Sequence, residues 1–205
     1  MVASAQNPED IINLALGTIG YKLRIGSIWE GSEAATAALD CYAQTRDEVL
    51  REGQWDFARG DATLTLLKSA PMGGYIPPND WNPATNPPPG WLFEYGYPDD
   101  CLKVRSLRQT PFVALDFDPQ PVLFSVVNDN AYTPARKVIV CNIAQAILTY
   151  TRQVTNPATW NANFTTLLAD TLGKKLAPSL KDLEAAKVAA AEENADGQAA
   201  AMAQG

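Results

Sequence analysis

Two groups of closely spaced carboxylates lie in the middle of the chain, Asp99 with Asp100 and Asp116 with Asp118. Paired carboxylates can act as general acid and base, or hold a hard cation through their oxygen atoms. Each group adjoins a proline, and aspartate next to proline is typical of turns. We therefore interpret the four residues as turn formers, with a carboxylate-dependent hydrolase as an alternative.

The chain contains no histidine, which removes the commonest general base and the most usual transition-metal ligand. Its three cysteines, Cys41, Cys101 and Cys141, include no Cys-x-x-Cys pair that could begin a zinc site. An odd, scattered set of cysteines is typical of buried thiols in a reducing compartment. The sequence excludes a Cys–His or Ser–His enzyme, and it predicts a protein without catalytic activity and with no metal or cofactor site.

Eight of the fifteen prolines fall between residues 71 and 98, so this stretch cannot hold a regular helix and is expected to form a long loop. A long ordered loop in a compact chain is usually functional or docked, and Trp and Tyr are favoured in interface cores. Exposed aromatic rings can also bind sugars. We expect the loop to pack on its own domain or on another subunit, and the alternative is a carbohydrate-binding or tail-associated recognition module. The residues expected to form a subunit or tail interface are Tyr75, Trp81, Trp91, Phe93 and Tyr95.

The charge balance is acidic, with 16 Lys and Arg against 23 Asp and Glu, a formal net charge of −7 and a pI of about 4.6. A protein that grips duplex DNA neutralises phosphates with Lys and Arg, so this balance argues against that role. The exception is a group of basic residues in predicted strands, which could form a nucleic-acid patch but is better explained as the solvent or subunit side of those strands. The group is Lys103, Arg105, Arg108, Arg136 and Lys137.

The length of 205 residues predicts one domain, or one core with a large insertion. The first residues lack a basic region followed by a long apolar stretch, so we expect no secretory signal. No run approaches the roughly 20 apolar residues that a membrane span needs. We therefore expect a soluble protein that is made in a cytoplasm.

Capping residues and helical spacing predict three helices. The first begins after Asn7 and ends before Gly17, and the second begins after Gly31 and ends near Gly53. Helical spacing of leucines returns after 163 and is expected to stop at Pro178.

Alternating or β-branched runs predict strands at about 101–108, 121–127 and 136–141. The segment 144–154 fits either a strand or a helix, and its Thr and Tyr content favours a strand. The predicted fold class is therefore α+β and mainly α: a helical bundle from both chain ends, with an inserted β-rich region and a long proline-rich loop. The predicted parts are 1–58, the N-terminal helices of the bundle; 59–155, the inserted region; 156–178, the C-terminal bundle helix; and 179–205, an alanine-rich helical tail.

The order of several motifs is more specific than any one of them. A short opening helix that ends in Leu-Gly is followed by the helix 34–51 and the run GQWDFA at 53–58. YPDDCLKV at 97–104 and TYTRQVTNP at 149–157 come next, and then Trp160 and Phe164. This order resembles the head-to-tail adaptor proteins of short-tailed bacteriophages, also called tail tubular protein A, over about residues 8–178.

The resemblance implies a structural protein of the virion neck or tail, made in the cytoplasm of the host bacterium. Such proteins form a ring, usually of twelve copies, between the portal and the tail tube or nozzle, and DNA passes through the lumen during ejection. The C-terminal segment of the family inserts toward the portal. Because the tail of this chain has too thin an apolar stripe to form its own core, we expect it to become ordered on that partner. The expected portal-docking residues are Leu180, Leu183, Val188 and Met202.

Overall fold

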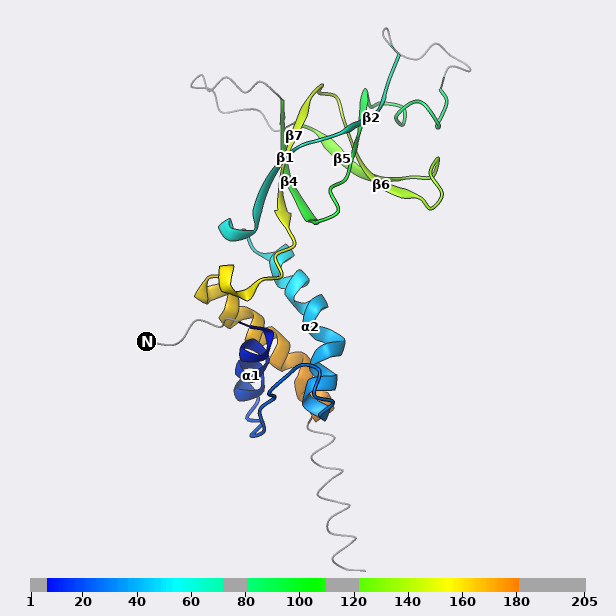
Figure 1. Cartoon of the computed structure of the whole chain (residues 1–205). Helices are drawn as coiled ribbons and strands as arrows, with labels where there is room; N and C mark the ends of the chain where they lie inside the picture. The colour runs from blue at the N-terminus through cyan, green and yellow to red at the C-terminus, as the bar shows by residue number, and fades with distance from the viewer. Residues whose placement is uncertain (1–6, 72–80, 110–121, 181–205) are drawn as a thin grey trace, which may run out of the picture. The chain divides into compact units, whose positions relative to one another are not determined.

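The computed structural model describes residues 7–71, 81–109 and 122–180, and the chain divides into two compact units. The helical unit consists of residues 1–53 together with 154–205, and the β unit consists of residues 54–153. Both ends of the chain thus belong to the same unit, and one continuous stretch of the middle forms the other (Figure 1).

The first two helices of the helical unit begin at side-chain caps and confirm the sequence prediction. Helix α1 (Pro8–Thr18) starts after Asn7, whose side chain and that of Asp10 cap each other's backbone amides. Helix α2 (Glu33–Glu52) starts after Ser32, which accepts a hydrogen bond from the amide of Ala35. The short 3-10 turn η2 (Pro157–Thr159) precedes a third helix over 162–180. This helix continues through Pro178, where the sequence predicts its end.

The core of the helical unit is made of apolar side chains from all three helices. Helix α1 and the helix over 162–180 approach each other closely at Gly173, where an added Cβ would lie 2.9 Å from the carbonyl oxygen of Ala15. The N-terminal and C-terminal segments of the chain therefore depend on each other for their packing. The largest fully buried side chains of this core are Ile11, Ile12, Leu16, Leu50, Phe164, Leu168, Leu172, Leu176 and Leu180.

The β unit consists of two antiparallel sheets. One has the strand order β1-β7-β4 and the other β2-β3-β6-β5. The chain passes from the first sheet to the second between β1 and β2, where the amide of Leu64 still donates to Ala146 and the carbonyl of Thr65 accepts from Gly96. The bounds are β1 (Arg59–Thr63), β2 (Leu66–Ser69), β3 (Phe93–Gly96), β4 (Cys101–Gln109), β5 (Phe124–Asp129), β6 (Arg136–Cys141) and β7 (Ala146–Arg152), with the 3-10 turn η1 (Asp56–Ala58) before β1.

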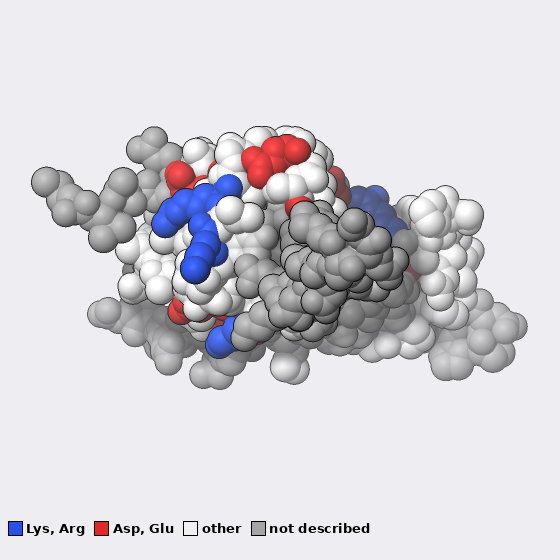
Figure 2. All heavy atoms as spheres, turned by 90° about the horizontal axis from the view of Figure 1, so that it is seen from below, with Lys and Arg blue, Asp and Glu red and all other residues white. Residues whose placement is uncertain are grey.

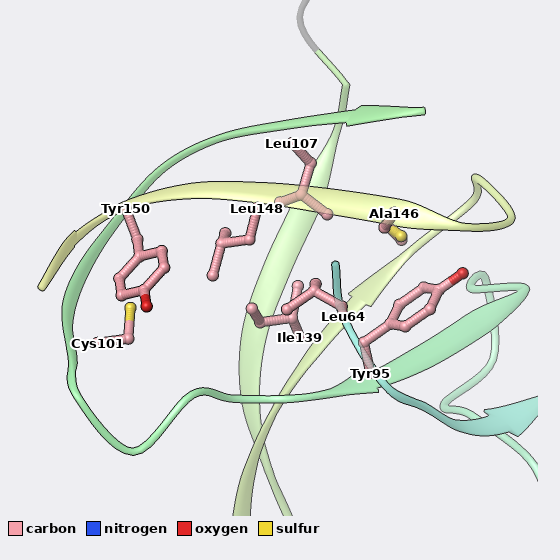
Figure 3. Close-up of a cluster of buried hydrophobic side chains, with 9 residues drawn as sticks. Leu64, Tyr95, Cys101, Leu107, Ile139, Ala146, Leu148 and Tyr150 are labelled. Atoms are coloured by element: carbon pink, nitrogen blue, oxygen red, sulfur yellow. The ribbon is translucent and has the colours of Figure 1, made fainter. Parts of the chain in front are cut away.

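The core of the β unit lies between the two sheets, and both contribute to it. In Figure 3 the labelled side chains converge on the space between the strands. Gly60 of β1 allows the ring of Tyr150 to lie against its backbone, since an added Cβ would come within 2.8 Å of the ring. The cluster contains Leu64, Tyr95, Cys101, Leu107, Ile139, Cys141, Ala146, Leu148 and Tyr150.

The predicted fold class, a mainly α helical bundle with an inserted β-rich region, is wrong. Over the residues that the structure describes, the protein is a mixed α/β structure with three helices and seven strands in two antiparallel sheets, and 37% of these residues are helical, 3-10 turns included, and 27% are in strands. The prediction omitted β1, β2 and β3, which are four or five residues long. Strands this short and rich in polar residues have little pattern of their own, and pairing with distant strands stabilises them. Strand β3 also lies inside the stretch predicted to be one long loop.

Candidate interaction surface

The connection between α1 and α2, residues 19–32, is held in place by side chains of α1. The side-chain amide of Asn13 donates to the carbonyl of Ile25 and its side-chain oxygen accepts from the amide of Ile25, both at 2.9 Å. Glu9 accepts a hydrogen bond from the amide of Ile28 at 3.2 Å. Ile25 itself is buried. These contacts fix the path of the loop across the helical unit.

Glu30 closes a turn within the same loop. Its carboxylate accepts hydrogen bonds from the hydroxyl of Ser32 at 2.6 Å and from the amides of Gly26 and Ser27 at 2.7 and 3.1 Å. The hydrogen bond from Ser32, followed by those from Gly26 and Ser27, lowers the pKa of Glu30 below its ordinary value. The carboxylate therefore stays ionised at neutral pH. It holds together the residues that precede and follow Trp29 in this turn.

This ordered loop presents apolar side chains to solvent. Trp29 is 76% exposed and Leu23 is 67% exposed, and Leu23 stands between the exposed cations Lys22 and Arg24. We call Lys22, Leu23, Arg24 and Trp29 the loop surface. A surface cavity of about 450 Å³ adjoins it, lined in part by Tyr21, Leu23, Arg24 and Ile25. Trp and Arg dominate the binding energy of many interfaces, so this combination is typical of a protein-binding site.

The loop surface is not evident from the sequence. Its only local signal is an apolar pair, Ile28 and Trp29, between the turn-forming pairs 26–27 and 31–32. That pattern fits a buried loop residue as well as an exposed one. Glu9 and Asn13 of the preceding helix form the hydrogen bonds that hold the loop. These contacts decide whether a residue of the loop is buried or exposed.

Replacing Asn13 with alanine is expected to release the loop. The change removes two partly buried hydrogen bonds, each of which contributes about 0.5–1.5 kcal/mol, so the free energy of unfolding should fall by about 1–3 kcal/mol. Urea denaturation measures the loss, and proteolysis within 19–32 should accelerate. Asn161→Ala is a matched control, since it removes a helix cap outside the loop. An unchanged proteolysis rate within the loop in the N13A variant would contradict this account.

The described part of the proline-rich stretch is anchored by a buried ionic cluster. Lys68 of β2 donates hydrogen bonds to the carbonyl of Pro83, at 2.7 Å, and to the carboxylate of Asp129, and its ammonium lies 3.6 Å from Glu94 of β3. The side chains of Lys68, Glu94 and Asp129 are 4%, 1% and 10% exposed. The ring of Tyr132 covers the ammonium at 5.3 Å. The cluster therefore fastens segment 81–91 to the sheet.

The two carboxyl groups of this cluster titrate differently. Burial raises the pKa of Glu94 to about 7, although the neighbouring ammonium of Lys68 opposes the shift. Burial also acts on Asp129, but hydrogen bonds from Lys68 and from the amide of Ala131 outweigh it and lower the pKa of that carboxyl. A carboxyl with a pKa near 7 has the proton affinity of a general acid or base. Glu94 is too deeply buried to reach a substrate, so its role in this fold is structural.

The predicted aromatic set separates into core and surface residues. Phe93 and Tyr95 belong to β3; Tyr95 is buried, its hydroxyl donates to the carbonyl of Ile143 at 3.0 Å, and Phe93 packs against the same core. Trp81 is exposed and its indole nitrogen donates to Pro87 at 2.9 Å, while Trp91 is half-buried. Tyr75 lies outside the described residues.

The described carboxylates of the hydrolase alternative form a turn. Asp99 and Asp100 are exposed and directly precede β4. The side chain of Asp100 accepts a hydrogen bond from the hydroxyl of Tyr150 at 3.0 Å, and its carbonyl accepts one from the amide of Gln153 at 2.7 Å. Asp116 and Asp118 lie outside the described residues. Within the described ranges, no three acidic or cysteine side chains are grouped so that they could hold a metal ion.

The basic residues of the strands do not form one patch. Lys103, Arg105 and Arg108 are on β4 of the three-stranded sheet, whereas Arg136 and Lys137 are on β6 of the other. Arg105 donates to Thr151 and to the carbonyl of Trp55, at 2.9 and 3.1 Å, and Arg108 pairs with Asp61 at 3.3 Å.

The cations of β6 lie against tyrosine rings. Arg136 lies over Tyr132 and Lys137 over Tyr97, so both are engaged within the β unit. On the face shown in Figure 2, charged side chains form small groups separated by uncharged surface. The strand cations are thus mostly used for internal contacts.

Of the expected portal-docking residues, Leu180 is buried at the end of the described part of the last helix, and Leu183, Val188 and Met202 lie outside the described residues.

None of the helices in the described part of the chain has the length and apolar character to cross a membrane. No protein-family model and no curated protein matches the chain. Its function therefore has to be inferred from its own residues.

Proposed function

We propose that the chain is a structural virion protein, the head-to-tail adaptor of a short-tailed bacteriophage. Copies of it form a ring between the portal and the tail tube or nozzle, and DNA passes through the lumen without specific binding. The observation that carries the proposal is that both units expose large apolar side chains. A ring subunit must contact two like neighbours and two different partners, and so needs several separate interfaces.

The exposed apolar side chains are distributed over elements of both units. Single exposed leucines are normal in any protein, but a tryptophan that an ordered loop leaves largely exposed is characteristic of an interface. On the helical unit the residues are Leu14, Leu23, Trp29, Leu39 and Leu167, and on the β unit they are Leu66, Trp81, Leu92, Leu123 and Val126.

Charge and chain length also support an adaptor. A net charge of −7 suits a conduit, because a lumen rich in Lys and Arg would retain the DNA that must pass. Twenty-five residues follow Leu180, the last buried residue described. We infer that Leu183, Val188 and Met202 in this segment dock on the portal.

The proposal is tested by mass measurement of the full chain alone and after mixing with purified portal. The expected result is a ring of copies on the portal. Deletion of 181–205, which spares the buried Leu180, should leave the thermal unfolding midpoint unchanged and abolish portal binding. A chain that stays monomeric and indifferent to portal at micromolar concentration would refute the adaptor function. Portal binding of the truncated chain with full affinity would refute only the role of the tail.

A further inference from the structure

We propose that the loop surface of one copy packs on the exposed face of α2 of a second copy, centred on Leu39 and Asp40. The inference rests on the proposed function, because it assigns the subunit contact from which the ring is built. Both patches belong to the helical unit and both are exposed within one copy. They therefore do not cover each other, and a neighbouring copy can reach each of them.

The loop side offers two apolar side chains and two cations. Leu23 and Trp29 supply the apolar contact, and burying them in an interface removes a large hydrophobic area from water. Neither Lys22 nor Arg24 forms an ion pair with any residue that the structure describes. Their charges remain available to a partner. The loop therefore fits a surface that is apolar at its centre and acidic at its rim.

The outer face of α2 has that character. Leu39 is 40% exposed and is followed by Asp40, and Thr36 and Ala43 are exposed on the same face one turn away in either direction. Asp40, like the loop cations, forms no ion pair within the described ranges. The helix as a whole contains five acidic residues against two basic ones. Its small side chains allow close approach, and its charge is opposite to that of the loop surface.

The occupant favoured by these observations is a second copy rather than a nucleic acid. Trp29 is followed directly by the ionised Glu30, and Glu33 is exposed three residues further on. Two carboxylates this close to Trp29 in the sequence disfavour a phosphate backbone. In the contact with a second copy, Lys22 and Arg24 opposite Asp40 supply the charge pairs that set its register.

In a ring the contact between copies is heterologous and joins two different patches. Each copy uses its loop surface toward one neighbour and its α2 face toward the other. Repetition of such a contact closes a ring when the rotation between copies divides a full turn. A two-fold dimer would instead use the contact twice within one pair of copies, and the mass of the assembly distinguishes such a dimer from a ring.

A charge exchange tests the contact in the full chain. Arg24→Glu and Asp40→Arg are each expected to weaken self-association at least tenfold, because each places like charges opposite one another. The double variant should recover to within about threefold of the unsubstituted chain, since it restores opposite charges. Sedimentation velocity over a concentration series and native mass spectrometry of the portal-bound ring give the readout. Trp29→Ala should weaken the same association, and circular dichroism checks that each variant is folded.

Lys174→Glu and Asp170→Arg are matched controls. They make the same charge changes at exposed sites of the helix over 162–180 that belong to neither patch, and should leave self-association unchanged. Equal loss in these controls, or a double variant no better than its parents, would overturn the inference. So would a mobility shift of duplex DNA at physiological salt that Arg24→Glu abolishes.

Failure of the assigned contact and failure of the adaptor function give different experimental results. If the unsubstituted chain forms rings on portal and both single variants do so with unchanged affinity, the assigned contact is wrong and the adaptor function stands. If the unsubstituted chain neither self-associates nor binds portal, the adaptor function fails, and this contact fails with it.

Discussion

Replacing Lys68 with methionine is expected to lower the free energy of unfolding of the β unit by about 3–5 kcal/mol at neutral pH. The change leaves the carboxylates of Glu94 and Asp129 buried without their cation, and it removes the hydrogen bond to Pro83. A loss of this size is a large fraction of the stability of an ordinary domain. Denaturant unfolding followed by circular dichroism measures it. Lys174→Met, the same change at an exposed site, should stay within about 0.5 kcal/mol.

The pH dependence separates this account from a simple loss of packing. Because the pKa of Glu94 is raised to about 7, the folded chain holds its proton more tightly than the unfolded chain between about pH 4.5 and 7. Stability from this group is present below that window and is lost as the pH rises through it. The contribution of Asp129, whose pKa is lowered, is instead lost below about pH 4. Glu94→Gln should remove the slope between pH 4.5 and 7.

Without Lys68 the buried carboxyls can avoid their charge only by binding protons. The destabilisation caused by Lys68→Met should therefore be smaller at pH 5 than at pH 7.5. The segment 81–91 should also become accessible to protease in this variant, since Pro83 loses its tie to the sheet. A destabilisation that is the same at both pH values would show that the ionic cluster is not what Lys68 maintains.

Replacing Gly173 with alanine is expected to destabilise the helical unit by about 1–3 kcal/mol, although alanine favours helices over glycine by about 1 kcal/mol. The new Cβ would lie 2.5 Å from the hydroxyl oxygen of Thr18 and 2.9 Å from the carbonyl oxygen of Ala15. The hydroxyl can rotate away, but the carbonyl belongs to the backbone of α1. The two helices would have to move apart, which opens the core between them.

Gly17→Ala is the control for this substitution. Gly17 lies in α1, and nothing lies within 4 Å of the position that its Cβ would take. The same chemical change should therefore stabilise the chain, by up to about 1 kcal/mol. Thermal unfolding of both variants measures the difference in sign. Stabilisation by both would mean that α1 and the last helix do not approach as closely as described.

The elements that the sequence predicts correctly are those with strong local signals. The caps at Asn7 and Ser32 mark where α1 and α2 begin, because a side chain there satisfies the first free amides. The β-branched run at 136–141 likewise predicts β6, and the Thr and Tyr content of 144–154 favours β7 over a helix. Each of these signals depends on a few neighbouring residues. The tertiary structure therefore keeps the helix or strand that the signal predicts.

The features that the sequence could not reveal depend on distant contacts. Lys68 and Asp129 are 61 residues apart, and nothing near Lys68 indicates that its ammonium is buried. The short strands β1 and β2 gain their hydrogen bonds from β7 and β3. The path of the loop that carries Trp29 depends on the hydrogen bonds between Asn13 and Ile25. In each case the deciding partner lies outside the window over which periodicity and capping operate.

The division of the chain into a middle and two ends has a consequence for its synthesis. All of residues 54–153 emerge from the ribosome before residue 154, so the β unit can fold during translation. The apolar face of α1, with Ile11, Ile12 and Leu16, must wait for the helix over 162–180, which is made only after the whole β unit. A nascent chain therefore carries an uncovered apolar helix while the β unit is synthesised, which makes this stage vulnerable to aggregation.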